Sequence, residues 1–312
     1  MFDFFWPLIK GSIIFIGIIT FVHLTFYLYK FYVAMWGKAR NLKEVFKTEW
    51  VMITGASSGV GRQLAYMCAN QGLNIVAIGR SNEKLTKMAI DLAPKNIKFK
   101  YHAVDLADLD APNRIFETNK DIKIGCLFIC HGFNNVGRIT DKSSDDIRHD
   151  LNAMTTSNIL LTKLFGNQTD FGTVTYISAI NADNHVSYAS IYGASKRFIN
   201  HFAEHMQSEG YFHNITFQAI CPDFIADTEF YRDMPQKIKD CAKDGVAPER
   251  VANAILATAG RNFTCDIGWD TIIIRFFMWI LPDFLQDKFF KMAGYNMMKE
   301  IWDHQMHHAK TD

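Results

Sequence analysis

The chain has 312 residues, of which 49% are hydrophobic and 21% are charged, and its formal net charge is +1 at pH 7. This composition excludes a disordered chain, and the small net charge provides no global field that would attract nucleic acid. The length accommodates one α/β domain of roughly 250 residues with attachments. Many of the 26 Phe residues lie near the chain ends, which indicates lipid contact or, alternatively, a Phe-biased genome.

The cysteines are scattered along the chain and form no CxxC pair. A zinc site needs ligands in tight local pairs, and the number of cysteines does not suggest a disulfide framework in a chain of this size. Several fall in stretches typical of core strands or helices, so we expect structural buried thiols and no metal site. The six cysteines of the chain are Cys68, Cys126, Cys130, Cys221, Cys241 and Cys265.

The N-terminal region, residues 1–46, is predicted to be a membrane anchor with a linker. Residues 11–29 form an uncharged apolar run between Lys10 and Lys30. At about 1.5 Å per residue, a helix of this length crosses a hydrocarbon core of about 30 Å. A cleaved signal peptide has a shorter apolar core and a small-residue cleavage site, whereas aromatic residues here continue to Trp36. We therefore expect a retained, single-pass anchor.

The charges that flank this run predict its orientation. Basic residues follow it at positions 30, 38, 40 and 43, whereas Lys10, opposed by Asp3, precedes it. By the positive-inside bias the bulk of the chain lies in the cytosol, and we expect the membrane to be that of the endoplasmic reticulum. Three N-x-T sequons leave a lumenal domain open as the alternative, because each is a potential glycan acceptor. They begin at Asn167, Asn214 and Asn262.

Residues 47–268 are predicted to form a single doubly wound, parallel-sheet Rossmann domain of the α/β class. The strand-like run WVMIT is followed by GASSGVGRQLAYMCANQG, a glycine turn that opens a helix. This unit binds dinucleotides, because Gly55 permits the turn, Gly59 lets the backbone approach the pyrophosphate and Gly61 lets the helix pack on the strand. The N–H groups at the helix start then face the phosphates.

The next strand, LNIVAIG, ends just before Arg80. NAD-selective sites place an acidic side chain here for the ribose 2′-hydroxyl, whereas an arginine suits a 2′-phosphate. The pattern favours NADP(H), with a solvent-facing arginine as the alternative. A third strand ends at Asp105 and Leu106, where an adenine would lie, and a fourth, IGCLFICHG, returns to the cofactor at residues 130–132.

The chemistry is predicted to centre on Tyr192 and Lys196, at the start of a helical run. A separation of four residues places both side chains on one helix face. A phenol with a pKa near 10 is a poor acid–base catalyst at neutral pH, and a nearby lysine cation favours its ionised form. We expect Tyr192 to give or take a proton, and Lys196 to assist it and to hold the nicotinamide ribose.

Together these motifs resemble the short-chain dehydrogenase/reductase family over about residues 50–268. Residues 54–61, TGASSGVG, are similar to the family's TGxxxGxG, and Tyr192 with Lys196 is similar to its YxxxK. The resemblance implies hydride transfer between C4 of a nicotinamide and a carbonyl or alcohol. With the anchor, it points to membrane-bound hydroxysteroid dehydrogenases and 3-ketosphinganine reductases as relatives. The cofactor-binding residues expected are Gly55, Ser57, Ser58, Gly59, Val60, Gly61, Arg80, Asp105, Leu106, Tyr192, Lys196 and Ile225.

The resemblance implies two further catalytic residues. Asn152 falls where the family keeps an asparagine that supports a proton-relay water. The family's serine, which hydrogen-bonds the substrate oxygen, stands thirteen residues before the tyrosine, where this chain has Ala179. We expect the neighbouring Ser178 to serve, by way of a one-residue loop insertion. Ser187 is the alternative.

Other positions depart from the family's pattern. The family's NAG appears here as Cys130-His131-Gly132, so an asparagine that helps to brace the sheet is lost. We expect His131 to brace the sheet in its place rather than to act as an acid or base. Asp223 replaces a glycine after the sixth strand, and Thr228 comes one place later than a threonine that often touches the carboxamide. His201 and His205 are spaced like a metal pair but lack a nearby third ligand, so we expect them on a helix surface.

The segments after the sixth strand concern the substrate and the membrane. In the family the interval 224–245 covers the substrate, and a helix is predicted near Pro248. The tail, residues 269–312, has an apolar run that contains Arg275 and is too short to cross a bilayer. This amphipathic tail lies in the membrane interface or packs on the domain or a homodimer partner. The expected substrate-lining residues are Phe224, Phe230, Tyr231 and Met234.

The sequence thus predicts an NADP(H)-dependent oxidoreductase that interconverts a ketone and a secondary alcohol on a lipophilic substrate. A steroid, a keto-fatty-acyl derivative and a ketosphingoid base all suit, and nothing in the sequence chooses among them. Membrane lipid is an expected partner and nucleic acid is not. The alternative is a catalytically weak, NADP(H)-binding membrane scaffold of the same fold, which only the displaced serine supports.

Overall fold

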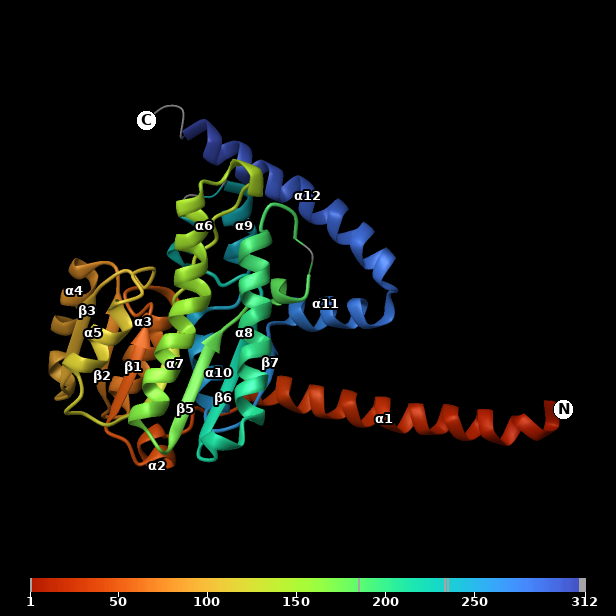
Figure 1. The fold of residues 1–312 in the computed structure, drawn as a ribbon, viewed down its shortest axis with the longest axis horizontal. Coiled ribbons are helices and arrows are strands. Elements are labelled where there is room, and N and C mark those ends of the chain that lie inside the picture. The colour runs from red at the N-terminus through yellow and green to blue at the C-terminus, as the bar shows by residue number, and fades with distance from the viewer. Residues whose placement is uncertain (1, 185, 233, 235, 309–312) are drawn as a thin grey trace.

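The structure is a computed structural model that describes residues 2–308 except 185, 233 and 235. A seven-stranded parallel sheet has the order β3-β2-β1-β4-β5-β6-β7, with helices on both faces (Figure 1). The strands are β1 (Trp50–Thr54), β2 (Asn74–Gly79), β3 (Phe99–Ala103), β4 (Ile124–Ile129), β5 (Gly172–Ile177), β6 (Ile215–Pro222) and β7 (Thr264–Ile267). The helices are α1 (Phe2–Trp36), α2 (Leu42–Phe46), α3 (Gly59–Asn70), α4 (Asn82–Leu92), α5 (Ala111–Thr118), α6 (Ser144–Leu151), α7 (Ser157–Gln168), α8 (Ser190–Ser208), α9 (Gln236–Lys243), α10 (Pro248–Thr258), α11 (Trp269–Ile280) and α12 (Asp283–His308).

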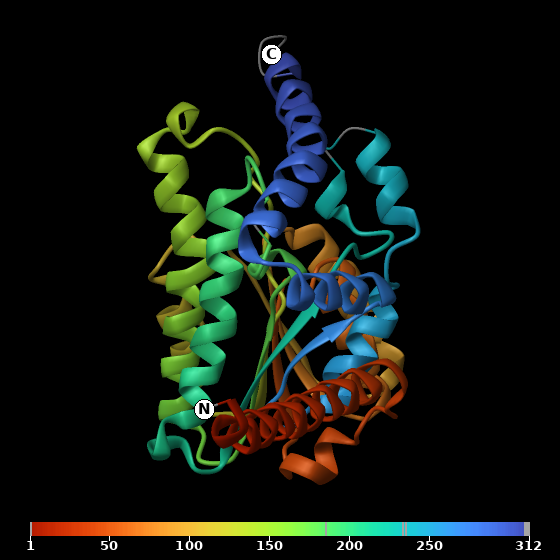
Figure 2. The same ribbon diagram turned by 90° about the vertical axis from the view of Figure 1, so that its right-hand side faces the viewer.

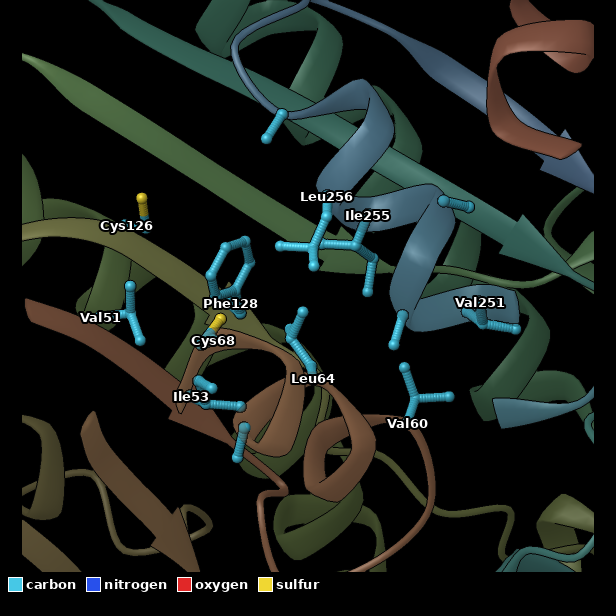
Figure 3. Packing of buried hydrophobic residues seen from close by; sticks show 14 of the residues in the cluster. Val51, Ile53, Val60, Leu64, Cys68, Cys126, Phe128, Val251, Ile255 and Leu256 are labelled. Carbon is cyan, nitrogen blue, oxygen red and sulfur yellow. The ribbon is translucent and has the colours of Figure 1, made fainter. Parts of the chain in front are cut away.

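The central strands are apolar on both sides because helices cover both faces of the sheet. Successive side chains of a strand point to opposite faces. Val51 and Ile53 of β1 therefore join one core cluster, with α3 and α10 (Figure 3), whereas Trp50 and Met52 join the other, with α7 and α8. This doubly wound architecture confirms the predicted fold class.

The strand order places a cleft where the chain crosses from one half of the sheet to the other. β1 pairs with β2 on one side and with β4 on the other, so the connections after β1 and β4 leave toward opposite faces. In parallel α/β sheets, ligands bind outside the carboxyl ends of the strands at such a switch point. The fold thus directs the search for a site to the loops that follow β1, β4, β5 and β6.

Helix α1 combines an apolar membrane-length segment with a domain contact. Residues 5–36 are long and apolar enough to cross a membrane, with a mean hydropathy of 2.0. From Tyr27 onward the helix is bound to the domain: the Tyr27 hydroxyl donates to Asp266 at 2.9 Å and Lys30 Nζ donates to the Thr264 carbonyl at 3.0 Å. Phe31 is buried in the domain core. The helix therefore ends inside the folded domain rather than in a separate linker.

The tail forms two helices, and Arg275 ties the first of them to the domain. Its Nε and Nη2 donate to the Asp266 carboxylate at 2.9 and 3.1 Å, and Nη1 pairs with Asp183. The opposite side of α11 carries exposed aromatic residues, including Phe276 and Phe277. Helices α1 and α11 leave the domain on the same side (Figures 1 and 2). Helix α11 is thus bound to the domain through Arg275 and leaves apolar side chains exposed.

Candidate active site

A cavity of about 410 Å³ opens at the carboxyl ends of the central strands. Its walls come from the glycine turn after β1, the loops after β2 to β6, and the start of α8. The structure brings almost all of the predicted site residues to it, Asn152 being the exception. The predicted residues that line it are Gly55, Ser57, Ser58, Gly59, Val60, Gly61, Arg80, Asp105, Leu106, Ser178, Tyr192, Lys196 and Ile225.

The glycine turn forms a cradle that side chains would fill. Gly55 has φ +63°, and a Cβ there would stand 2.9 Å from the backbone nitrogen of His131. A Cβ on Gly61 would stand 2.4 Å from the Gly55 carbonyl oxygen, so helix and turn can pack this closely only around glycine. The side chain of Ser58, which caps α3, makes no hydrogen bond to the first-turn amides. These amides are therefore available to phosphate oxygens, and the cradle fits a dinucleotide.

Arg80 and Asp105 lie on the adenine side of the cradle. The Arg80 side chain is exposed and, within the described part of the chain, has no hydrogen-bond or ion-pair partner. Asp105 accepts a hydrogen bond from the Ala107 amide at 2.9 Å. Burial alone would raise the pKa of Asp105, but this bond, His149 and Arg80 together bring it below its usual value. The result is an unpaired cation beside an ionised carboxylate.

Tyr192 and Lys196 lie on one face of α8, as predicted, and both are buried. Burial raises the pKa of Tyr192, and Tyr231 and Asp223 raise it further. Lys196 Nζ donates to the Ile177 carbonyl at 2.7 Å and lies 5.6 Å from the centroid of the Tyr192 ring. Burial lowers the pKa of Lys196 to about 8. At neutral pH the pair is therefore a protonated phenol beside an ammonium group, the state suited to giving a proton.

Ser178 lies at the end of β5 and directs its hydroxyl toward α8. Its Oγ donates to the carbonyl of Lys196 at 3.0 Å, and the residue is almost fully buried. Ala179, at the family's serine position, lines the cavity beside it. Ser187 is not among the residues that line the cavity. Of the two serines considered from the sequence, Ser178 is thus the one that the fold brings to the site.

Asn152 marks a break in a long helical segment and is not among the residues that line the cavity. It ends α6 and begins a π-helical stretch, residues 152–156, that leads into α7. Its Nδ2 donates weakly, at 3.4 Å, to the carbonyl of Ala107, on the loop that follows β3. The role that the resemblance implies for Asn152, support of a proton-relay water, stays a prediction. The neighbouring Ala153 lines the cavity instead.

His131 joins the central strands to this π-helical stretch. Its Nδ1 lies 2.7 Å from the Thr54 hydroxyl, and its Nε2 lies 2.8 Å from the Ala153 carbonyl. Burial lowers the pKa of His131 to about 4. The ring is therefore neutral, with Nε2–H donating and Nδ1 accepting, and its contacts are those of a brace. His201 and His205 are exposed on α8.

The loop between β6 and α9 covers the cavity with aromatic residues. Phe230 and Tyr231 belong to a short 3-10 turn, residues 229–231, and the Phe230 ring lies 5.9 Å from that of Tyr192. Phe230, Tyr231 and Met234 line the cavity, whereas Phe224 packs against the same apolar cluster. The Tyr231 oxygen accepts a hydrogen bond from the Ile225 amide at 3.4 Å. The region beside the phenol is therefore largely apolar.

Asp223 is a lining residue to which sequence analysis gave no role. It follows the last residue of β6 and lines the cavity with Tyr192 and Lys196. The sequence does show that an acid replaces the family's glycine at this position, but the sequence alone does not predict that this residue lines the cavity. Asn134 also lines the cavity, and no feature of the sequence distinguished it.

Comparisons with known proteins agree with this geometry. The family model for short chain dehydrogenase matches residues 49–239. Very-long-chain 3-oxoacyl-CoA reductase-A of Danio rerio is 28% identical, over 72% of this chain and 74% of its own length. The 7beta-hydroxysteroid dehydrogenase of Mediterraneibacter gnavus is also 28% identical, over 69% of this chain and 84% of its own.

Solved structures share the fold. One, described for the stereoselectivity of 7beta-hydroxysteroid dehydrogenase, has a TM-score of 0.70 at 20% identity and covers 80% of this chain and 99% of its own. The L-sorbose reductase of Gluconobacter frateurii, solved with NADPH and L-sorbose, has a TM-score of 0.60 at 21% identity and covers 70% and 94%. At this identity such likeness establishes the fold alone.

The family match extends over more than half of the chain and includes the cradle, Tyr192 and Lys196. Members of this family bind a nicotinamide cofactor and catalyse an oxidoreductase reaction between a ketone and an alcohol. The relatives of this chain are of the keto-acyl and hydroxysteroid type. With fold, site and family model in agreement, the chain belongs to the short chain dehydrogenase family.

Proposed function

We propose that this protein is a membrane-anchored, NADP(H)-dependent enzyme that interconverts a lipophilic ketone and its secondary alcohol. The observation that carries the proposal is that Tyr192 and Lys196 line one cavity. The glycine cradle forms one side of this cavity, and aromatic residues form the other. A phenol, an ammonium group and a dinucleotide cradle in one cavity are what carbonyl reduction requires.

A nicotinamide dinucleotide held by the glycine cradle would supply the hydride chemistry at the carbonyl or alcohol carbon. Tyr192 gives its phenolic proton to the carbonyl oxygen in reduction and takes the hydroxyl proton in oxidation. Lys196, charged below a pKa of about 8, stabilises the phenolate that reduction leaves behind. Ser178 donates a hydrogen bond to the substrate oxygen once its hydroxyl leaves the Lys196 carbonyl. Asn152 acts at a distance, by holding the loop that carries Asp105.

The preference for NADP(H) rests on Arg80. This guanidinium lies beside the cradle without a partner among the described residues, and a 2′-phosphate is the acceptor that suits it. Solved structures of the same fold were determined with NADPH or NADP bound, among them an L-sorbose reductase and a short chain dehydrogenase from Burkholderia cenocepacia, which supports the proposal. NADPH and NADH compared under the same conditions decide it.

The lipophilic substrate is supported by the lining of the cavity and by the anchor. Phe230, Tyr231 and Met234 offer an apolar wall, and the names of the relatives refer to 3-oxoacyl-CoA and hydroxysteroid substrates. We propose that α1 spans the membrane of the endoplasmic reticulum with the catalytic domain on the cytosolic side, as the flanking basic residues favour. A substrate dissolved in the bilayer then enters from the side on which α1 and α11 leave the domain.

The test is oxidation of NADPH by the full-length protein in detergent or nanodiscs with a panel of lipid ketones. We expect turnover by the wild type. In Tyr192→Phe the rate should fall by at least about 100-fold, because the variant keeps the ring and loses the phenolic proton. NADPH binding, followed by fluorescence, should persist in the variant. Turnover that survives this change would refute the assignment of Tyr192.

The scaffold hypothesis is favoured by one observation, the alanine at position 179. It predicts NADPH binding with no turnover of any ketone in the panel by the wild type. The buried pair of Tyr192 and Lys196 weighs against it, since a scaffold has no need to bury an ammonium group at a cost in free energy.

A further inference from the structure

Asp223 lines the cavity at the carboxyl end of β6. It shares the cavity with Tyr192 and Lys196 and with the aromatic residues of the covering loop. The Asp223 carboxylate contributes to the raised pKa values of both Tyr192 and Tyr231. Asp223 therefore lines the same cavity as both phenols and acts on them electrostatically.

Among the described residues, Asp223 has no cationic partner. In the part of the chain that the structure describes, the Phe224 amide hydrogen-bonds the Asp223 carboxylate, and the charged group that acts on it is a second acid, Asp270 at the start of α11. A partly buried carboxylate without a counter-ion is costly to keep, so the cavity retains an uncompensated negative charge beside its phenols.

The cations that line the cavity are engaged elsewhere or lie on the cofactor side. Lys196 donates to the Ile177 carbonyl, Arg232 pairs with Glu229 at 2.8 Å, and Arg80 lies beside the adenine end of the cradle. Burial raises the pKa of Asp223 to about 6, with Asp270 adding to the effect and the Phe224 amide opposing it. The carboxylate is therefore mostly ionised at neutral pH.

We propose that Asp223 binds a protonated amine that the substrate carries next to its ketone. This inference rests on the proposed function and narrows it: of the lipophilic ketones considered, a long-chain 2-amino-3-ketone has the required cation, whereas a steroid ketone and a 3-keto-acyl thioester lack one at that position. The ammonium group pairs with Asp223, and the adjacent carbonyl oxygen lies at Tyr192. The alkyl chain extends along Phe230 and Met234.

The pairing also affects the chemistry. The negative charge of Asp223 helps to hold the proton on Tyr192. A substrate ammonium group offsets that charge, so the phenol becomes a stronger acid when an amine-bearing ketone is bound. Asp223 would thus both strengthen the binding of an amine-bearing ketone and speed proton transfer to its carbonyl oxygen.

The experiment compares kcat/KM of the full-length protein, at saturating NADPH, for two matched probes. One is a long-chain 2-amino-3-ketone and the other is its 2-hydroxy analogue, which has nearly the same shape and no charge. We expect the wild type to prefer the amine, and Asp223→Asn to reduce the amine-to-hydroxyl ratio by about 10- to 100-fold. Below pH 6 the wild-type ratio should fall as Asp223 takes up a proton, and in the variant this dependence should disappear.

Asp227→Asn is the matched control. Asp227 is an exposed acid on the same loop, does not line the cavity, and has φ +49°, a conformation that asparagine tolerates well. The control should keep the wild-type ratio. An unchanged ratio in Asp223→Asn, with turnover of either probe still dependent on Tyr192, would overturn the ammonium site alone. Absence of turnover of every ketone by the wild type would overturn the proposed function, and the ammonium site with it.

Discussion

The hydroxyl of Ser178 donates a hydrogen bond to the carbonyl oxygen of Lys196 at 3.0 Å. The donor that the substrate oxygen would need is therefore engaged by the backbone of the catalytic helix. Hydrogen bonds of this kind often rearrange when substrate binds, and Ser178 needs to turn only its own side chain. Ala179, one residue further, lines the cavity without a hydroxyl to offer.

This arrangement predicts a rescue. Ser178→Ala should lower kcat/KM for a lipid ketone by about tenfold, the value of one hydrogen bond of about 1.4 kcal/mol. Adding Ala179→Ser should restore part of the loss, because it places a hydroxyl at the family's own serine position. Steady-state kinetics of the single and double variants measure both effects. A loss confined to thermal stability, with kcat/KM intact, would assign Ser178 to holding α8 only.

The pH dependence of reduction should report Lys196. Its pKa in the folded protein is lowered to about 8, so the ammonium group is present below that pH and is lost as pH rises through it. The kcat/KM for ketone reduction at saturating NADPH should therefore fall above pH 8. In Lys196→Arg, whose guanidinium stays charged, the fall should move to higher pH even if the maximal rate is lower. An unmoved alkaline limb would assign it to another group.

Cofactor choice should depend on Arg80. Arg80→Glu replaces a donor for a 2′-phosphate by an acceptor for a ribose 2′-hydroxyl. A charge-assisted hydrogen bond contributes about 1.5–3 kcal/mol, so the ratio of kcat/KM for NADPH to that for NADH should fall by at least about tenfold. Arg62→Glu, on α3 and not among the cavity-lining residues, is the control. Equal use of both cofactors by the wild type would contradict the NADP(H) proposal.

The Arg275 contacts should contribute to stability. Asp266 is almost fully buried, and it shares this guanidinium with Asp183, which also pairs with Arg197. Arg275→Met therefore leaves chiefly the buried Asp266 carboxylate with less charge compensation. We expect a loss of about 2–3 kcal/mol in the free energy of unfolding. Arg148→Met, which removes an exposed pair with Asp145, should cost less than about 1 kcal/mol. Thermal unfolding in detergent compares the two, and similar losses would argue against a structural role for Arg275.

The exposed face of α11 should matter for lipophilic substrates only. Replacing Phe276, Phe277 and Trp279 by glutamine removes apolar surface without touching Arg275. Activity toward a long-chain ketone presented in vesicles should fall several-fold more than activity toward a small soluble ketone. Tyr211→Gln, at an even more exposed aromatic residue elsewhere in the domain, should change neither. Parallel losses for both ketones would remove the support for lipid contact.

Much of the fold could be predicted because its signals are local. The apolar run that became β1 matches the predicted residues, and α10 begins at Pro248 as expected. The helix that carries Tyr192 begins at Ser190, so the separation of four residues does place Tyr192 and Lys196 on one face. The aromatic residues expected over the substrate do gather around Tyr192.

The parts that could not be predicted depend on long-range contacts. Asn152 has the right neighbours in sequence, but the π-helical turn that begins there sets its direction, and its side chain meets Ala107. Arg275 suggested a membrane surface because it stands among aromatic residues, yet its partners are Asp266 and Asp183. The sequence alone could not show which carboxylates the fold would bring to it.

The burial of the last turns of α1 has a mechanical consequence. A domain joined to its anchor by a flexible linker samples all orientations relative to the membrane, and it encounters its substrate as a soluble enzyme would. Here Tyr27 and Phe31 fuse the helix to the sheet, so with the helix in a bilayer the domain would stand at a fixed tilt and height above the lipid. The rate at which the domain meets its substrate would then depend on the surface concentration of substrate in the membrane. Dilution of the membrane with inert lipid should therefore lower the reaction rate, even when the total amount of substrate is constant.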